Sequence, residues 1–233
     1  MKRPLNHPDY RITQLSEDSC LLRFTPAEEQ LPSAELQQRI CNFALRLQEN
    51  SRELQLLEVV PGVGNLLLQF LPLCSLDAIQ RQQGMLKKIE GHWAQTEDAP
   101  ISGKTIDIPV HYGGELGADL EALARTCALS PDEVIHLHTA PIYSVYCIGF
   151  QPGFAYMGGL DARIHCPRKH TPSTKVPAGA VAIGGAQTGI YPFASPGGWH
   201  VIGHTDIELF NPQKSPASTL QAGDKVRFVK ALS

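Results

Sequence analysis

The chain has 233 residues, enough for one large domain or two ordinary ones, and its hydrophobic share of 42% and charged share of 18% are typical of a globular protein. A formal net charge of −3 and a pI near 6.3 argue against the concentrated basic face that nucleic acid or an anionic membrane requires. No apolar run approaches the roughly 18 residues of a membrane span, and the first ten residues lack the apolar stretch of a secretory signal. We therefore expect a cytoplasmic protein.

The first part of the chain predicts four short strands. Each is a run of apolar and β-branched residues bounded by turn residues, and the last two are joined through Pro61–Gly64, a turn with two glycines and a proline. The strands are expected over residues 10–15, 20–25, 54–60 and 65–71.

Two helices alternate with these strands. The first is expected over 31–50, with Ser33 as its N-cap and apolar residues recurring on one face, and the second opens at Ser75. With a closing strand at 105–110, the order strand–helix–strand–strand–helix–strand is that of a ferredoxin-like split βαβ unit. We expect an α+β fold whose N-terminal ferredoxin-like domain covers residues 1–100.

The second domain is expected over 101–233. It opens with two short helices, one beginning at Asp119 and one at Ser130–Glu133, where Ser as N-cap, Pro at the first helical position and Glu three residues after the Ser make a capping box. From a strand at 143–150 to a last strand at 223–229, the remaining segments are short strands and turns. Many short strands with Gly and Pro turns favour a barrel or a sandwich.

The stretch from Ile148 to Thr205 is the candidate site region. It holds eleven of the 20 glycines and six of the 18 prolines, so its backbone follows a specified, irregular path. An irregular backbone that carries donors and aromatic rings is how a scaffold presents a site. The candidate side chains in this stretch are Gln151, Tyr156, Arg168, Lys175, Gln187, Tyr191, Trp199 and His204.

Several candidates have a structural alternative. Arg168 and Lys175 are either solvated surface cations or a clamp for a carboxylate or phosphate, and Arg168 could also join Asp161 and Arg163 in a loop salt-bridge network. Gly197 and Gly198 either bring backbone N–H groups close to an anion or serve a barrel corner.

Standard catalytic motifs are mostly missing. The sequence contains no phosphate-binding glycine loop, no H-E-x-x-H and no G-x-S-x-G. The even spacing of His200 and His204 predicts one shared face of a strand, but a metal site would need a third ligand from elsewhere, so we expect no metal. No nucleophile–base pair can be named from spacing, which fits half of a composite site.

The segments GFQPGFAYMGGL and PRKHTPSTKVPAGAVAIGGAQTGIYPFASPGGWHVIGHT resemble the signature of the allophanate hydrolase subunit 1 family. The resemblance implies that the C-terminal domain over 101–233 is a cyclophilin-like β-barrel. Many members carry Arg where this chain has Ser173 and Gln where it has His200, so the resemblance transfers no role to these two positions.

The family includes the B subunit of the bacterial ATP-dependent 5-oxoprolinase, so the resemblance implies a hydrolase component that helps convert 5-oxo-L-proline, ATP and water to L-glutamate, ADP and phosphate. It implies two partners, the A subunit together with the C subunit, which is itself cyclophilin-like. It further implies a site shared with the second of these partners and ATP as co-substrate. The expected catalytic residues are His204 and Arg168. The expected substrate-binding residues are Gln151, Tyr156, Gln187, Tyr191, Gly197, Gly198 and Trp199.

The alternative is a regulator that resembles another family member, an inhibitor of a sporulation histidine kinase, and acts by binding a partner protein. Prolyl isomerase activity would rest on the analogy of fold alone.

Overall fold

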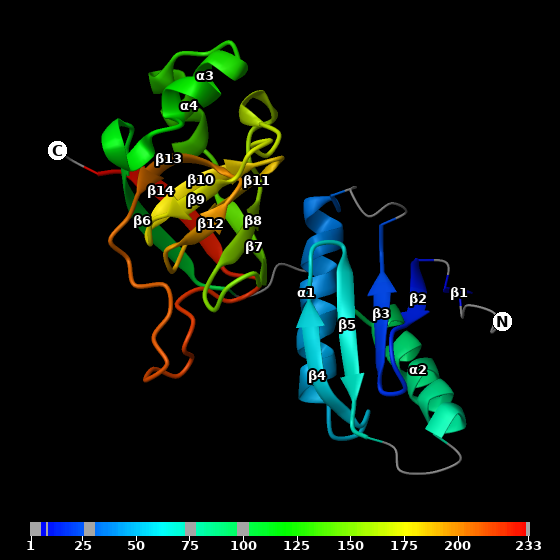
Figure 1. Ribbon diagram of the computed structural model, residues 1–233. Helices are drawn as coiled ribbons and strands as arrows, with labels where there is room; N and C mark the ends of the chain where they lie inside the picture. Colours follow the sequence, from blue (N-terminus) through cyan, green and yellow to red (C-terminus); the bar gives the residue numbers. More distant parts are fainter. Residues whose placement is uncertain (1–5, 8, 26–30, 73–77, 97–102, 232–233) are drawn as a thin grey trace. The chain divides into compact units, whose positions relative to one another are not determined.

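The structure is a computed structural model that describes residues 6–7, 9–25, 31–72, 78–96 and 103–231 (Figure 1). The chain divides into two compact units, Met1–Ile101 and Ser102–Ser233. The predicted N-cap Ser75 lies outside the described residues. Within the described ranges, no helix has both the length and the apolar character needed to cross a membrane.

The N-terminal unit is an antiparallel sheet with two helices. Its elements are β1 (Asn6–His7), β2 (Tyr10–Gln14), β3 (Ser19–Arg23), α1 (Ala34–Glu49), β4 (Leu56–Pro61), β5 (Asn65–Phe70) and α2 (Ala78–Ala94). The strand order is β1-β2-β3-β5-β4. Because β3 and β4 both run antiparallel to β5, the β3–α1–β4 connection encloses one strand, as in a split βαβ unit. The predicted cap is also present, since the Ser33 hydroxyl accepts from the Leu36 N–H at 3.1 Å.

The predicted closing strand of this sheet is wrong. Residues 105–110 are a strand, but they belong to β6 (Thr105–Tyr112) of the C-terminal unit. The place beside β3 is taken instead by β2, which pairs with it antiparallel from Arg11–Arg23 to Gln14–Cys20. The ferredoxin-like strand order is therefore not confirmed, because the fourth strand comes from before the unit and not from after it.

An aromatic cluster closes the core of the N-terminal unit. Trp93 of α2 lies 4.7 Å from Phe24 and 5.1 Å from Phe43 between ring centroids, and its indole N–H donates to Asp9 at 2.8 Å. The guanidinium of Arg39 on α1 lies over the same ring at 4.0 Å. Both helices are thereby fixed on one face of the sheet.

The C-terminal unit is a closed barrel of seven strands, which confirms the barrel expected there. Its order is β10-β11-β8-β7-β14-β6-β13, and β13 pairs back onto β10. The barrel strands are β6, β7 (Tyr143–Ile148), β8 (Ala155–Gly158), β10 (Ala180–Gly184), β11 (Gln187–Ile190), β13 (His200–His204) and β14 (Lys225–Lys230). Strands β6 and β14, from the two ends of the unit, pair in parallel over six residues.

Four short helices and a two-stranded sheet complete the unit. The helices are η1 (Gly114–Gly117), α3 (Leu120–Thr126), α4 (Pro131–Thr139) and η2 (Ala162–Ile164), and the small sheet is β9 (Ser173–Val176) with β12 (Ser195–Gly197). Helices α3 and α4 pack together (Figure 1). The predicted capping box of α4 is confirmed: the Ser130 hydroxyl accepts from the Glu133 N–H, and the Glu133 carboxylate accepts from the Ser130 N–H.

The barrel has two hydrophobic cores, one on each side of β10. Val181 and Ile183 belong to the large interior core, whereas Ala180 and Ala182 belong to a second cluster that contains the aromatic rings. Side chains alternate between the two faces of a strand, so this second cluster lies on the outer face of the barrel wall. The small residues of β10 leave space there for large side chains from the loops.

A buried histidine links α4 to the barrel interior. The Thr188 hydroxyl donates to the Ala182 carbonyl at 3.0 Å, so it accepts from Nε2–H of His138 at 2.9 Å. Nδ1 of His138 then accepts from the Tyr112 hydroxyl at 2.7 Å. Every polar atom in this chain of contacts is satisfied only when the imidazole is neutral. Burial accordingly lowers the pKa of His138 from 6.5 to about 3.

The depressed pKa predicts a loss of stability in mild acid. Because the folded pKa is below the unfolded one, the unfolded chain binds the proton first as the pH falls. The contribution is complete above pH 6.5 and is lost as the pH falls toward 3. Below pH 6.5 the free energy of unfolding should fall by up to about 1.4 kcal/mol per pH unit through this one group. Urea unfolding at pH 7.5, 6 and 5 measures the slope.

His138→Gln should reduce this slope, since an amide does not titrate in the window. His136→Gln is the matched control, because His136 lies on the exposed face of the same helix. An unchanged slope in His138→Gln would contradict the assignment.

Candidate functional site

A pocket of about 210 Å³ adjoins the outer aromatic cluster of the barrel. It is lined by five aromatic side chains, two cationic ones and a few prolines and glycines. In chain order these are Phe150, Phe154, Tyr156, Arg168, Lys169, Pro172, Tyr191, Pro196, Gly197, Gly198 and Trp199. The structure thus brings together six of the nine predicted site residues, namely Tyr156, Arg168, Tyr191, Gly197, Gly198 and Trp199. The other three, Gln151, Gln187 and His204, are not among the lining residues.

The Trp199 ring packs directly on the backbone of two glycines, Gly184 and Gly189. A Cβ added to Gly184 would lie 2.5 Å from the indole, and one added to Gly189 would lie 3.1 Å from the indole and 2.9 Å from the Phe154 ring. Ordinary Cβ contacts are longer, so a side chain at either glycine would displace the rings. Trp199 is only 5% exposed, which makes it both a packed side chain and a wall of the pocket.

Phe154 is the centre of the aromatic layer. Its ring centroid lies 4.9 Å from Tyr156, 5.3 Å from Tyr191 and 5.6 Å from Trp199, each at a steep interplanar angle. Edge-to-face pairs of this kind contribute about 0.5–1.5 kcal/mol each beyond their burial. Three such pairs around one ring fix the shape of the pocket before any ligand arrives.

Phe150 stands at the rim of the pocket in a strained conformation. Its φ of 64° is in the left-handed region, and its side chain is 60% exposed while its ring contacts Phe154 and Tyr191 edge-on. An exposed aromatic residue at positive φ is unfavourable unless the surroundings impose it. The rings of Phe150, Phe154 and Tyr156 all line the pocket.

Arg168 is the free cation of the pocket. Its guanidinium lies 5.9 Å from the Trp199 ring centroid, and no carboxylate in the described part of the chain forms an ion pair with it. The alternative loop network does not include it, because Asp161 pairs with Arg163 alone at 2.7 Å. Lys175 is exposed and does not line the pocket.

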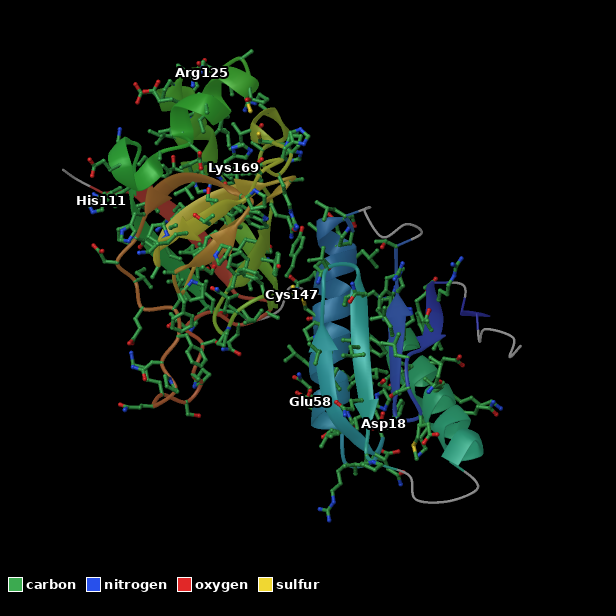
Figure 2. All side chains as sticks on the ribbon, in the orientation of Figure 1. Asp18, Glu58, His111, Arg125, Cys147 and Lys169 are labelled. Carbon is green, nitrogen blue, oxygen red and sulfur yellow. The ribbon has the colours of Figure 1, made fainter. Side chains whose placement is uncertain are left out.

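Lys169 was not predicted from the sequence. Its Nζ lies 2.5 Å from Oδ2 of Asp119 and donates to the Ser173 hydroxyl at 3.2 Å (Lys169 is labelled in Figure 2). The same Asp119 oxygen accepts from the Val201 N–H at 2.8 Å, and the Lys169 N–H donates to the Gly198 carbonyl at 2.8 Å. The Asp119–Lys169 pair therefore holds the loop after η2 against β13, and the backbone bond from Lys169 holds it against Gly198. Fifty residues separate the two partners, so no local spacing could indicate the contact.

The two tyrosines of the pocket are neutral phenols. Burial raises the pKa of both Tyr156 and Tyr191, and the nearby Arg168 guanidinium only partly opposes this. Gly197 makes room for one of them, since a Cβ there would lie 2.3 Å from the Tyr191 hydroxyl oxygen. Both phenols can therefore donate or accept hydrogen bonds but carry no charge.

Gln151 and Gln187 share an unusual property. Oε1 of Gln151 and Nε2 of Gln187 are buried, and neither has a hydrogen-bond partner among the described residues. Leaving a buried amide atom unpaired costs about 1–3 kcal/mol. Their predicted role in substrate binding stays a prediction, since neither residue lines the pocket.

A β-bulge separates the two histidines of β13. The register shifts opposite Val181 and Ala182, so His204 pairs with the outward residue Ala180 while His200 pairs with the inward residue Ile183. The predicted shared face is therefore wrong.

The two histidines also bond to different segments. Nε2 of His204 donates to the Ala178 carbonyl at 3.0 Å, and Nε2 of His200 donates to the Pro167 carbonyl at 2.9 Å. The catalytic role of His204 stays a prediction.

Cys166 lies beside His200 but is not an activated nucleophile. Its Sγ is 3.4 Å from Nε2, yet that nitrogen already donates its proton to Pro167 and cannot accept another. Burial also raises the pKa of the Cys166 thiol. Among the described residues, no three His, Cys, Asp or Glu side chains gather in a way that would hold a metal ion.

Comparison with known proteins identifies relatives along nearly the whole chain. The family model for the carboxyltransferase domain, subdomain C and D, matches residues 10–220. A protein of Haemophilus influenzae, named as the B subunit of 5-oxoprolinase, is 42% identical over 218 residues, which cover 94% of this chain and 96% of that protein. A Bacillus subtilis protein of the same name is 51% identical over 134 residues, or 58% of this chain and 56% of that one.

Solved structures add further relatives, some of them longer than this chain. TTHA0988 matches at 34% identity with a TM-score of 0.75 over 92% of this chain, which spans 40% of that chain. PH0987 from Pyrococcus horikoshii is 41% identical with a TM-score of 0.55, covering 94% of this chain and 97% of its own. The K. lactis urea amidolyase, at 17% identity and a TM-score of 0.75, shares the fold over 16% of its length. The extent of the sequence matches shows that the chain belongs to the family of the carboxyltransferase domain, subdomain C and D, together with the proteins named as the B subunit of 5-oxoprolinase.

Proposed function

We propose that the chain is the B subunit of an ATP-dependent 5-oxoprolinase, in which 5-oxo-L-proline, ATP and water give L-glutamate, ADP and phosphate. The observation that carries this proposal is the end-to-end similarity to a protein of that name, at 42% identity over 94% of the chain and 96% of the relative. The match includes the whole pocket segment and both units, so the relation concerns the complete fold and not a shared motif.

The chemistry of the pocket supports a role in binding. Opening a lactam by way of ATP requires that the amide oxygen be phosphorylated, which makes the ring carbon electrophilic toward water. The developing negative charge is best stabilised by fixed donors and cations in a dry site. The pocket supplies a free guanidinium and two neutral phenols on rigid aromatic walls.

The same pocket lacks the groups that would complete the reaction. Among the described residues that line it there is no His, Asp, Glu, Cys or Ser side chain, and Lys169 is held by Asp119. In this proposal the remaining groups come from the C and A subunits, with ATP as co-substrate of the complex.

The isolated chain should not hydrolyse 5-oxo-L-proline, because the described pocket lining offers no His, Asp or Glu as a base and the sequence contains no phosphate-binding glycine loop. Turnover should appear only when the C and A subunits from the same organism are added. Coupled assays for ADP and glutamate, run on each protein separately and on the mixture, test this. Lactam-dependent glutamate release by the rigorously purified chain alone would refute the shared site, and a full mixture without turnover would refute the function.

Arg168→Ala should lower kcat/KM of the reconstituted enzyme by about 10- to 100-fold, the usual effect of removing a hydrogen bond to a charged group. The melting temperature should not change, because Arg168 is exposed and unpaired among the described residues. Arg163→Ala is the matched control, since Arg163 lies in η2 just before this loop and pairs with Asp161. Equal losses in both variants would show that Arg168 is a solvated surface cation with no specific role in the site.

His204→Gln should leave kcat nearly unchanged. The Gln amide keeps a donor toward the Ala178 carbonyl, and the His204 side chain packs on the turn at Gly179 and not on the pocket. Steady-state kinetics of the reconstituted enzyme measure the effect. A loss of about 100-fold in turnover, on the scale of a lost general acid or base, would confirm the catalytic role predicted from the sequence.

A further inference from the structure

The size of the pocket restricts its ligand. A volume of about 210 Å³ is below the roughly 300–1,000 Å³ of sites that hold drug-sized molecules. A nucleoside triphosphate, with its base, sugar and three phosphates, exceeds the space that this chain alone encloses. This space fits a compact molecule the size of a small substituted ring.

The charge of the pocket further restricts the class of ligand. Two cations line it, but the carboxylate of Asp119 neutralises Lys169 at 2.5 Å. Burial keeps Tyr156 and Tyr191 protonated, and no acidic side chain is among the lining residues. The net charge is therefore +1, carried by the Arg168 guanidinium. One guanidinium matches one carboxylate through its paired N–H groups, whereas a polyphosphate would need several cations.

The aromatic walls of the pocket restrict the shape of the ligand. Rings of Phe150, Phe154 and Tyr191 meet edge-on on one side, and the indole of Trp199 stands between Phe154 and the Arg168 guanidinium. Such walls accept a small flat ring on their faces, with its carboxylate directed to the cation at the rim.

We propose that this pocket is a subsite for a small cyclic monoanion, with Arg168 as its specificity-determining residue and the Asp119–Lys169 pair as the positioning element that holds the pocket at a single positive charge. This rests on the proposed function, within which it assigns the lactam 5-oxo-L-proline to this chain and places the binding of ATP on other subunits.

The two tryptophans of the chain provide the measurement. Trp199 lines the pocket and Trp93 is buried in the N-terminal unit, so Trp93→Phe leaves one fluorescent reporter at the site. The intact chain carrying this change is titrated with 5-oxo-L-proline, with pyrrolidin-2-one, which lacks the carboxylate, and with ATP. If Trp93→Phe does not fold, calorimetry on the unaltered chain replaces fluorescence.

The expected result is saturable binding of 5-oxo-L-proline, binding of pyrrolidin-2-one weaker by about tenfold or more, and no displacement of the lactam by ATP. Arg168→Gln should remove the preference for the carboxylate, while Arg163→Gln keeps it. Equal binding of the two lactams, displacement by ATP or absence of 5-oxo-L-proline binding overturns the proposal.

Asp119→Asn tests the charge of the pocket directly. The Asn carbonyl can still accept from the Val201 N–H, but Lys169 loses its counter-charge. The affinity for the dianion glutarate, relative to 5-oxo-L-proline, should rise by about tenfold at low ionic strength and decline with added salt. Asp161→Asn, which frees the cation of Arg163 outside the pocket, is the control. An unchanged ratio in Asp119→Asn overturns the role of the pair.

The binding test and the turnover test can refute the subsite and the proposed function independently. Turnover by the reconstituted complex without lactam binding to this chain would overturn the subsite and leave the function standing. Lactam binding without turnover in the full complex would do the reverse.

Discussion

The pocket depends on bare backbone on the outer face of the barrel. Strands β10 and β11 present Ala180, Ala182, Gly184 and Gly189 to this face, and the indole of Trp199 lies on the two glycines, closer than any Cβ would permit. Because Trp199 is placed there, Phe154 can pack on its edge, and Tyr156 and Tyr191 can pack on Phe154. A methyl group at Gly184 would disturb the whole layer and with it every wall of the pocket. Gly184, Gly189 and Gly197 therefore make room for the packing of aromatic rings.

The two cations that line the pocket differ in their partners. Lys169 contacts the carboxylate of Asp119, just as Arg163 outside the pocket contacts that of Asp161. Arg168 contacts only an aromatic face among the described residues. An exposed, unpaired guanidinium contributes little to folding, whereas the Lys169 pair fixes the loop that carries it. In the proposed binding role, Arg168 would contact the ligand, whereas the Asp119–Lys169 pair holds the loop in place.

Features that depend on neighbouring residues could be predicted from the sequence, whereas the pairing of distant segments could not. The caps at Ser33 and Ser130, the strand at 105–110 and the glycine-rich site segment each follow from residues within a few positions of one another. The partner of that strand does not: β6 pairs with β14 about 120 residues later, and nothing in TIDIPV distinguishes this from closing the first sheet. The bulge in β13 likewise reversed the face of one histidine, because alternation assumes an unbroken ladder. The Asp119–Lys169 pair was missed for the same reason, since its partners meet only in the folded barrel.

Strand β11 connects the two sides of the barrel wall. Thr188 points inward and receives the N–H of His138, while its neighbour Gly189 faces outward beneath Phe154 and Trp199. The inner network has one donor for each acceptor, from Tyr112 through His138 and Thr188 to the Ala182 carbonyl, so it permits a single arrangement of these groups. Ala182 also contributes its methyl group to the outer cluster. One residue therefore has its carbonyl bonded to Thr188 inside the barrel and its methyl group packed under the aromatic rings outside. A neutral His138 thus stabilises the backbone on which the aromatic pocket is built, although it lies on the opposite side of the sheet from any ligand.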